Sequence, residues 1–378
     1  MAHFAYRLRS ANARALLVVG LIISLVSTGS VNTALDMYAF AKKKSSDRLS
    51  REASDTSENG ANIGDNSLLQ EDEGQGSESL PLPVETPTNS KFVIINFDDS
   101  HESDYTYAKP VLDKYGFKAT FFEVCNWIEA GYHDKDTSIT WEKTTALQED
   151  GMDIEAHTMT HPNLNHKSQP DLDYEIGQSK QCLENHGFNP TIFAYPNGEG
   201  ADNPKVVNTI AKYYDLARTD SKSALTFLHC NGDNNEQTDC STQFSDGTLT
   251  PSNRYSINSW AHKHIVNSCS PDVGDSDTGT CATVRHEYDN AQMFHKFVSV
   301  VNNQSNYNKD GIVRAIPIIV YHILVNYPDL SDSNRPIDTT VNLFDAEMRY
   351  LYDNGFKVIT MSDLGYYPDS KSVYIKAS

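Results

Sequence analysis

Two neighbouring carboxylates and two histidines carry the strongest chemical signal in this sequence. Asp98 and Asp99 directly follow the apolar run 92–97, and adjacent carboxylates repel each other unless they are paired or bind a cation. His157 and His161 are four residues apart, a spacing that brings both imidazoles to one face of a helical turn. Two histidines and one carboxylate leave an open position for water, as a catalytic zinc site requires.

Each of these signals has a more ordinary explanation when it is taken alone. An aspartate often caps the helix that follows it, and two histidines at this spacing are commonly unrelated surface residues. A non-haem iron oxygenase uses the same ligand types, but its usual His-x-Asp/Glu order is absent here. A glycosidase is disfavoured, because two adjacent aspartates do not flank a scissile bond.

Alternating strands and helices are expected to position these residues. The apolar runs predict strands over 92–97, 118–124, 152–156, 191–195, 315–321 and 356–360. Helices are predicted over 107–115, 144–149, 171–186, 204–214 and 343–354. This alternation predicts an α/β fold with a parallel sheet or barrel, in which chemistry lies at the carboxyl ends of the strands. Polar candidates do follow the apolar runs: Asp98, Asp99, His157, His161, Asn197 and His322.

The composition limits the classes of partner. Lys and Arg total 31 against 51 Asp and Glu, a net charge of −20. This balance argues against a nucleic-acid binder, which needs basic side chains to displace counterions from phosphates. The 38 % of hydrophobic residues is enough for a folded core.

The first ninety residues are predicted to lie outside the folded domain. Three arginines precede the apolar run Leu16–Val26, and Ala39–Ala41 offers a cleavage site, so residues 1–41 resemble a signal peptide. The alternative is a single uncleaved N-terminal membrane anchor, although the run is short of the roughly 20 residues that a spanning helix needs. Residues 42–90 are predicted to be a disordered acidic linker. Both alternatives place the domain, residues 91–378, outside the cytoplasm, secreted or at the cell surface.

Residues 220–290 interrupt the alternation and are expected to form a polar, disulfide-containing loop insertion. Six cysteines suit an exported protein, but they allow 15 pairings, so the sequence does not fix their connectivity. We expect two local bridges that staple long loops, Cys230–Cys240 and Cys269–Cys281, with Cys125 and Cys182 left over.

Several segments match motifs of a known family, in the same order. The segment 96–100 (NFDDS) resembles a T-F-D-D-G motif, 157–164 (HTMTHPNL) matches H-[ST]-x-x-H, and 193–198 (FAYPNG) and 321–322 (YH) resemble two later motifs. Together they resemble the NodB-homology polysaccharide deacetylases (carbohydrate esterase family 4), with the third motif closest to the branch acting on poly-N-acetylglucosamine. The resemblance covers about residues 91–215 and 312–365.

The resemblance implies a distorted (β/α) barrel and a divalent metal, most commonly Zn²⁺, with Co²⁺ or Ni²⁺ as alternatives. On the matching positions of this sequence, Asp99, His157 and His161 would hold the metal, Asp98 would be the base, His322 the acid, and Tyr195 and Asn197 would contact the substrate or its oxyanion.

Three positions depart from the family pattern. Ser100 replaces a glycine, and Asn197 replaces a tyrosine of the usual third motif, of which only the backbone N–H is needed. Ala194 replaces the arginine of that motif, which orients the base. We expect Arg254, from a later segment, to take over this contact with Asp98.

The expected function is a metal-dependent hydrolase that removes N-acetyl groups from an extracellular polysaccharide or glycoconjugate of the N-acetylglucosamine type, acting as a monomer. Two alternatives remain. One is a non-catalytic surface protein that binds glycan on the same barrel, and metal content would distinguish it. The other is a hydrolase of a small amide or cyclic imide, which substrate profiling would distinguish.

Overall fold

The computed structural model describes residues 91–133, 136–220, 224–228, 254–275, 280–327 and 335–376. The predicted signal peptide or anchor and the predicted linker lie outside these residues, so both stay predictions. Within the described part of the chain, no helix has the length and apolar character needed to cross a membrane.

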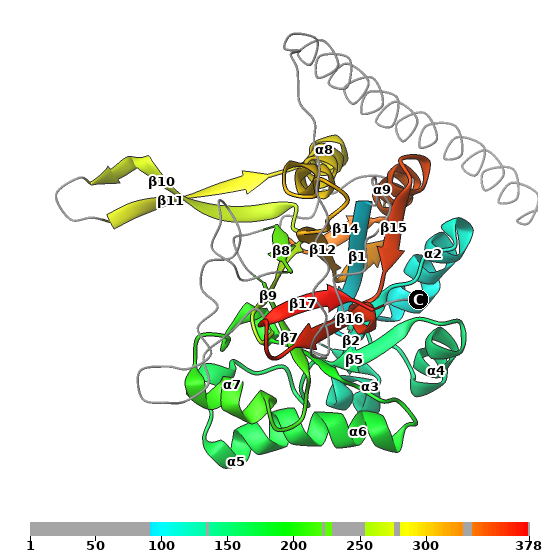
Figure 1. Cartoon of the computed structure of the whole chain (residues 1–378), viewed down its shortest axis with the longest axis vertical. Helices are drawn as coiled ribbons and strands as arrows, with labels where there is room; N and C mark the ends of the chain where they lie inside the picture. The colour runs from blue at the N-terminus through cyan, green and yellow to red at the C-terminus, as the bar shows by residue number, and fades with distance from the viewer. Residues whose placement is uncertain are drawn as a thin grey trace, which may run out of the picture. The chain divides into compact units, whose positions relative to one another are not determined.

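Seven parallel strands close into a barrel, which confirms the predicted (β/α) fold (Figure 1). Their order is β1-β2-β5-β6-β7-β9-β12, and β12 pairs again with β1. The register places Phe97 of β1 opposite Phe121 of β2 and Tyr321 of β12. The strands are β1 (Lys91–Asp98), β2 (Thr120–Glu123), β5 (Asp153–Ala156), β6 (Ile192–Ala194), β7 (Leu216–Asp220), β9 (Ile257–Ala261) and β12 (Ala315–Tyr321).

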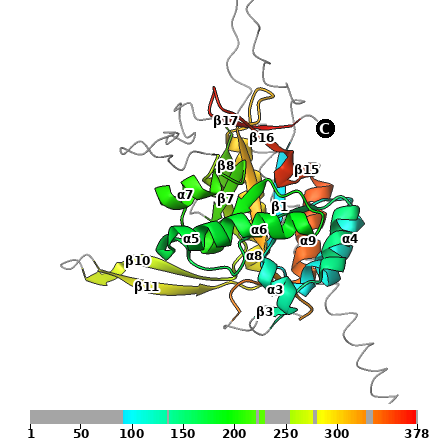
Figure 2. The ribbon, with the colours of Figure 1, turned by 90° about the horizontal axis from the view of Figure 1, so that it is seen from below.

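Helices pack around the outside of the barrel, as Figures 1 and 2 show from two directions. They are α2 (Lys109–Tyr115), α3 (Cys125–Ala130), α4 (Trp141–Glu149), α5 (Gln169–Leu172), α6 (Ser179–Asn185), α7 (Pro204–Ile210), α8 (Asn290–Asn303) and α9 (Val341–Asp353). Short π-helical turns, η1 (Asp104–Ala108) and η3 (Asp173–Gln178), lead into α2 and α6. The predicted helices over 107–115, 171–186 and 343–354 correspond to η1–α2, α5–η3–α6 and α9.

The barrel interior is apolar below the strand ends. A buried cluster joins inward-facing residues of the strands with three residues of the C-terminal segment, Met361, Leu364 and Val373. The hairpin β16 (Leu364–Tyr367) with β17 (Ser372–Ile375) brings two of these residues to the cluster, and the Val373 N–H donates to the Leu228 carbonyl. The hairpin therefore adds apolar cover to the core, leaving the opposite, carboxyl ends of the strands for polar groups.

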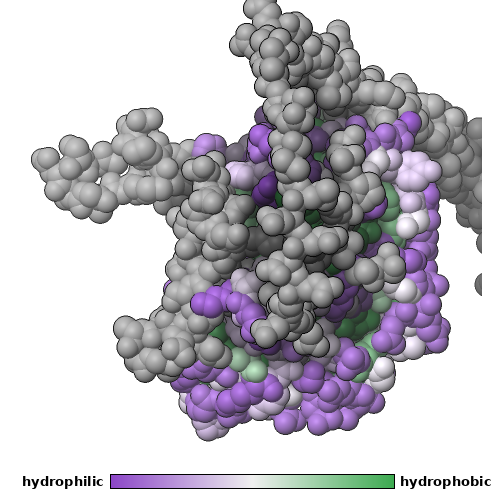
Figure 3. Space-filling view, viewed as in Figure 1, coloured by the Kyte–Doolittle hydropathy of each residue, from purple (hydrophilic) through white to green (hydrophobic). Residues whose placement is uncertain are grey.

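The remaining strands either pair with a barrel strand or form separate two-stranded sheets. Strand β15 (Phe356–Ile359) pairs with β1, and β8 (Leu225–Phe227) pairs antiparallel with β12. The short strands are β3 (Tyr132–His133), β4 (Asp136–Thr137), β13 (Ile323–Val325) and β14 (Asp338–Thr340). On the face shown in Figure 3, the described surface is mainly hydrophilic with smaller apolar areas.

The expected insertion over 220–290 is wrong in part. Residues Ile257–Ala261 form barrel strand β9, while β10 (Ile265–Asp275) and β11 (Thr280–Glu287) form an antiparallel hairpin that projects from the barrel in both ribbon views. The sequence hid β9 because its inward position Ser259 is polar, which breaks the apolar run that marks a buried strand.

One disulfide lies in the described residues, and it joins Cys125 of α3 to Cys182 of α6. It lies outside the segment where we expected the bridges. Cys230 and Cys240 fall outside the described residues, and only the backbone of Cys269 and Cys281 is described, so the two expected local bridges stay predictions.

Candidate functional site

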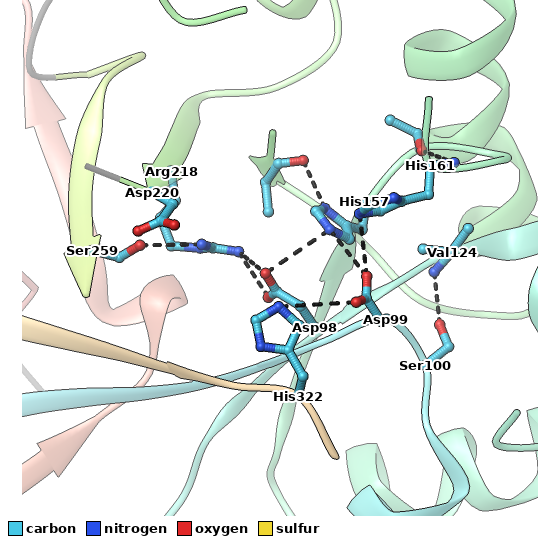
Figure 4. A network of polar contacts seen from close by, with 12 residues as sticks. Asp98, Asp99, Ser100, Val124, His157, His161, Arg218, Asp220, Ser259 and His322 are labelled. Atoms are coloured by element: carbon cyan, nitrogen blue, oxygen red, sulfur yellow. Dashed lines mark hydrogen bonds and ion pairs between the residues drawn. The ribbon is translucent and has the colours of Figure 1, made fainter. Parts of the chain in front are cut away.

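The polar candidates meet at the carboxyl ends of the barrel strands (Figure 4). Asp98 is the last residue of β1, and Asp99 follows it. His157 follows β5 and His322 follows β12, which pairs directly with β1. The predicted clustering at one end of the barrel is therefore what the structure shows, because parallel strands deliver all their carboxyl ends to the same side.

Asp99, His157 and His161 form a group that could hold a metal ion. Oδ1 of Asp99 lies 3.3 Å from Nε2 of His161 and 3.5 Å from Nε2 of His157. Tetrahedral zinc with bonds of about 2.0–2.1 Å separates neighbouring ligand atoms by about 3.3 Å, so the spacing fits. Asp99 Oδ1 is also buried and has no hydrogen-bond partner among the described residues. A bound cation would satisfy this oxygen.

A second contact fixes the ring of His157. Its Nδ1 lies 2.9 Å from the carbonyl oxygen of Ala194, at the end of β6. A carbonyl only accepts, so Nδ1 carries the proton and Nε2 presents its lone pair towards Asp99. Ligand histidines are commonly oriented in this way by the nitrogen that does not bind the metal.

The pKa shifts at this group follow from burial and from its close spacing. Burial disfavours the Asp99 carboxylate, but the neighbouring histidines His157, His322 and His161 hold its pKa well below the usual value. Burial lowers the pKa of His161 to about 4, so its imidazole is neutral at pH 7. For His157, burial favours the neutral ring, but Asp98 and Asp99 prevail and raise its pKa. Protons therefore compete with a cation for Nε2 of His157.

The backbone around the ligands is strained. Asp99, Thr158 and His161 have φ values of 76°, 73° and 57°, in the left-handed region that non-glycine residues rarely adopt. The Thr158 hydroxyl accepts the His161 N–H at 2.8 Å, which holds the turn between the two histidines. Such strain concentrates at functional sites, where the surrounding structure offsets its cost.

Glu175 of η3 holds the same turn from outside. Its Oε2 accepts the backbone N–H groups of Met159 and Thr160 at 3.1 and 2.9 Å, and its Oε1 accepts the Thr160 hydroxyl at 2.6 Å. The side chain is only 5 % exposed. Glu175 therefore fixes the two residues between Thr158 and His161.

Arg218 of β7 binds Asp98. Its Nη2 donates to Oδ1 and Oδ2 of Asp98 at 2.7 and 2.6 Å, and its Nη1 donates to the Ser259 hydroxyl at 3.2 Å. Arg218 is 1 % exposed and its guanidinium lies 4.8 Å from the centre of the Phe122 ring. This buried pair holds the carboxylate of Asp98 beside the metal-ligand group, where its Oδ2 is 3.9 Å from His157 Nε2.

The structure does not bring Arg254 to Asp98, which corrects our assignment. The Nε of Arg254 donates to the carbonyl of Asp215 at 2.5 Å, and its guanidinium packs on the rings of Tyr255 and Tyr366. The backbone carbonyl of Arg254 accepts from Ala217, on the strand β7 that carries Arg218. Arg218 of β7, and not Arg254, makes the contact with Asp98.

His322 completes the group on the side of β12. Its Nε2 lies 3.9 Å from Oδ2 of Asp99, and its Nδ1 has no hydrogen-bond partner among the described residues. Burial lowers the pKa of His322, against the opposing charges of Asp99 and Asp98.

Comparisons with known proteins agree with these motifs. Residues 85–217 match the family model described as polysaccharide deacetylase. This stretch of the chain belongs to the polysaccharide deacetylase family.

Individual relatives share only part of their length with this deacetylase domain. The Bacillus subtilis protein YxkH is 35 % identical over 121 residues, which is 32 % of this chain and 42 % of that protein. A peptidoglycan-N-acetylglucosamine deacetylase of Bacillus cereus is 30 % identical over 117 residues, or 30 % and 50 % of the two chains. The solved structure of the Streptococcus pyogenes deacetylase PplD with acetate has 25 % identity and a TM-score of 0.35, and the match covers 44 % of this chain and 62 % of that one. The chain therefore spans about half the length of the curated relatives it matches.

Tyr195 and Asn197, the two remaining candidates, lie in different surroundings. Tyr195 is buried, its hydroxyl donates to the carbonyl of Tyr255 at 3.0 Å, and its N–H donates to the carbonyl of Arg218 at 3.0 Å. Neither donor of Tyr195 is available to a substrate, so this assignment is corrected. Asn197 is exposed, with a φ of 55°, in the turn that follows the His157 contact at Ala194. Its contact with an oxyanion stays a prediction.

Sequence reasoning missed Arg218 and Glu175. Arg218 interrupts the short run Leu216–Asp220, which we did not assign to a strand, and its polar side chain at a strand centre was the available signal. Glu175 lies in a predicted helix among other charged residues, and no local pattern distinguishes it from a solvent-facing glutamate.

Proposed function

We propose that this protein removes N-acetyl groups from an extracellular polysaccharide or glycoconjugate of the N-acetylglucosamine type, in a metal-dependent hydrolysis. The observation that carries the proposal is the joint placement of Asp98, Asp99, His157, His161 and His322 at one end of the barrel. The matched family supports deacetylation of a polysaccharide as the reaction class. The metal dependence, the sugar and the steps below are our own inferences.

The metal would be held by Asp99, His157 and His161, and zinc suits this donor set, with Co²⁺ or Ni²⁺ as alternatives. When bound, a divalent cation supplies polarisation of the acetyl carbonyl and acidification of the attacking water. The three side chains contribute one carboxylate charge and two neutral imidazoles, so a positive charge remains at the site to attract the carbonyl oxygen.

Asp98 is the proposed base. Its carboxylate takes the proton of the attacking water as the water oxygen bonds to the acetyl carbon. The two contacts from Arg218 leave the carboxylate little freedom to rotate, so its free lone pairs stay directed at the site.

His322, in its protonated form, is the proposed acid. Its Nε2, which faces the site, gives a proton to the acetamide nitrogen as the C–N bond breaks, because an amine leaves poorly without one. The products are acetate and a free amino sugar, and the proton taken by Asp98 replaces the one lost by His322. The exposed turn at Asn197 offers a backbone N–H to the oxyanion that forms meanwhile.

We place this reaction outside the cytoplasm, with the protein secreted or held at the cell surface. The N-terminal segment that resembles a signal peptide or anchor supports this placement. The Cys125–Cys182 disulfide supports it as well, because such bonds persist in oxidising compartments.

The test is acetate release from N-acetylglucosamine oligomers by the full-length chain with added zinc or cobalt. Asp98→Asn and a chelated sample are the controls. We expect release by the wild type, a loss of about 100-fold or more in the variant, and recovery of the chelated sample on adding metal back.

Two outcomes would contradict the proposal. Absence of release from a folded sample with one metal per chain would point to another acyl substrate, such as a small amide. Absence of both release and metal would favour the glycan-binding alternative.

A further inference from the structure

Four buried polar side chains form a chain of hydrogen bonds behind His322. The hydroxyl of Tyr321 donates to Oε2 of Glu347 at 2.7 Å, and Nε2 of His262 lies 2.9 Å from the other carboxylate oxygen. Oγ1 of Thr339 lies 2.9 Å from Nδ1 of His262. All four residues have an exposed fraction of 0 %. None of them belongs to the metal-ligand group, so the proposed chemistry does not explain them.

One arrangement of protons satisfies all three hydrogen bonds among these four side chains. The Glu347 carboxylate accepts from Tyr321 and from the Nε2–H of His262, and the Nδ1 of His262 then accepts the Thr339 hydroxyl proton. The His262 ring also stacks on the Tyr321 ring, with centroids 4.8 Å apart. Apolar residues of similar volume often stabilise a core as well as a buried polar group does. Stability alone therefore does not explain why these four polar residues lie here.

The chain of contacts encloses the segment that carries His322. Tyr321 is the residue before His322, and the His262 N–H donates to the carbonyl of Val320 at 2.8 Å. On the other side, β13 begins at Ile323 and pairs with β14, where Leu324 lies opposite Thr339. Both flanks of His322 are thereby tied to the same buried group.

The ring of His322 depends on these flanks for its position. Its Nδ1 lacks a hydrogen-bond partner among the described residues, in contrast to His157, whose Nδ1 is bound to a carbonyl. The segment after it has one more contact, from the Leu324 N–H to the Ser103 hydroxyl at 3.1 Å. The direction of Nε2 towards Asp99 is therefore set mainly through the backbone.

We propose that His262 and Glu347 are positioning residues that aim His322 at the reacting nitrogen. This inference rests on the proposed function, in which His322 is the acid. Neither residue touches the substrate. They fix Tyr321 and, through Thr339, the strand that follows His322.

The test compares two substrates of the full-length, metal-loaded protein. An N-acetylglucosamine oligomer needs a proton on its leaving nitrogen, whereas an activated acetyl ester such as 4-nitrophenyl acetate does not. We expect Glu347→Leu to lower kcat for the oligomer by about 100-fold with little change in KM, and to leave ester hydrolysis within a few-fold. Glu347→Gln, which keeps the shape and an acceptor for Tyr321, should recover most of the loss.

Gln304→Leu is the matched control. Gln304 is also buried and hydrogen-bonded, but to the backbone of Phe92 and Val301, at the opposite end of β1. We expect Gln304→Leu to disturb packing only, and so to lower oligomer hydrolysis and ester hydrolysis by the same factor. Equal loss of both reactions in Glu347→Leu would overturn the proposal. If Glu347→Leu does not fold, Tyr321→Phe serves in its place with a smaller expected selective loss.

A second readout does not depend on deacetylase activity. Diethyl pyrocarbonate modifies histidines at rates that follow their exposure, and mass spectrometry locates the modified residue. We expect a several-fold faster modification of His322 in Glu347→Leu, with His186, which lies at the end of α6, unchanged. If the wild type releases no acetate, the proposed function fails, and an unchanged rate at His322 would separately overturn the positioning proposal.

Discussion

At the scale of single residues, Arg218 controls Asp98. The guanidinium contacts both oxygens of Asp98 inside the protein, so removing it leaves a buried negative charge without its partner. Without these two contacts the carboxylate of Asp98 is also free to rotate away from the site where the base must act.

We therefore predict that Arg218→Met lowers acetate release by about 100-fold or more. Arg254→Met is the control, because Arg254 binds the backbone at Asp215 and should leave the rate nearly unchanged. The measurement is kcat/KM on N-acetylglucosamine oligomers for both variants, with circular dichroism to confirm folding. Similar rates for the two variants would show that Arg218 does not act through Asp98.

The charge state of His157 makes metal binding depend on pH. The pKa of His157 is raised in the metal-free protein, so protons compete with a cation for its ring, whereas His161 is already neutral above a pKa of about 4. The affinity for metal is therefore complete above the pKa of His157 and falls as the pH drops through it.

We predict a zinc affinity that weakens by up to tenfold per pH unit as the pH falls through the raised pKa of His157. Isothermal titration calorimetry in buffers of different ionisation enthalpy would report both the affinity and the protons released. A constant affinity as the pH crosses this pKa, with no proton release, would contradict the assignment of His157 as a ligand.

At the scale of elements, the turn between β5 and α5 depends on its neighbours. Glu175 holds Met159 and Thr160 from η3, and the N–H groups of Cys125 and Asn126 at the start of α3 donate to the carbonyls of Thr158 and Met159. The two proposed ligands His157 and His161 are thus held by contacts from elements that precede and follow them in the chain.

We predict that Glu175→Ala lowers metal affinity by about 10-fold, because the strained turn loses the acceptor that holds it. Glu184→Ala is the matched control, since Glu184 lies in the following helix and its only described ion pair is with Lys180 on the surface. The measurement is the Kd of each variant for zinc, determined by competition with a chelator. Equal affinities would mean that the turn is held without Glu175.

At the scale of the whole barrel, the Cys125–Cys182 disulfide links helices on its outer surface over 57 residues of sequence. Closing a loop of this length restricts the unfolded chain and stabilises the folded state by roughly 4 kcal/mol in the chain-entropy model. Because Cys125 also begins α3, the bond supports the helix whose N–H groups hold the His157–His161 turn.

We predict that the double variant Cys125→Ala, Cys182→Ala loses roughly 4 kcal/mol of unfolding free energy and binds metal less tightly. Urea unfolding with and without a reductant measures the first effect. The wild type under reductant should lose at least as much as the untreated variant. An unchanged midpoint in the variant would show that the bond contributes little to stability.

The sequence by itself determined the parts of this protein whose information is local. The apolar run before Asp98 and Asp99 predicted a buried strand with a polar end, and the structure has both. Alternating strands and helices predicted a parallel sheet or barrel, and the family resemblance favoured the barrel. Such patterns are properties of neighbouring residues, which is why these predictions agree with the structure. The spacing of His157 and His161 predicted a helical turn, and this is wrong: residues 157–161 are not helical, and Thr158 and His161 have positive φ values.

Only the tertiary structure decided which distant residues become partners. Arg218 and Asp98 are 120 residues apart, and nothing in the local pattern favours Arg218 over Arg254. The polar inward residues of β7 and β9 concealed two barrel strands, because a strand that carries site residues loses its continuous apolar run. Such pairings follow from barrel closure, which brings β7 across from β1, and closure is a property of the whole set of strands that no single segment encodes.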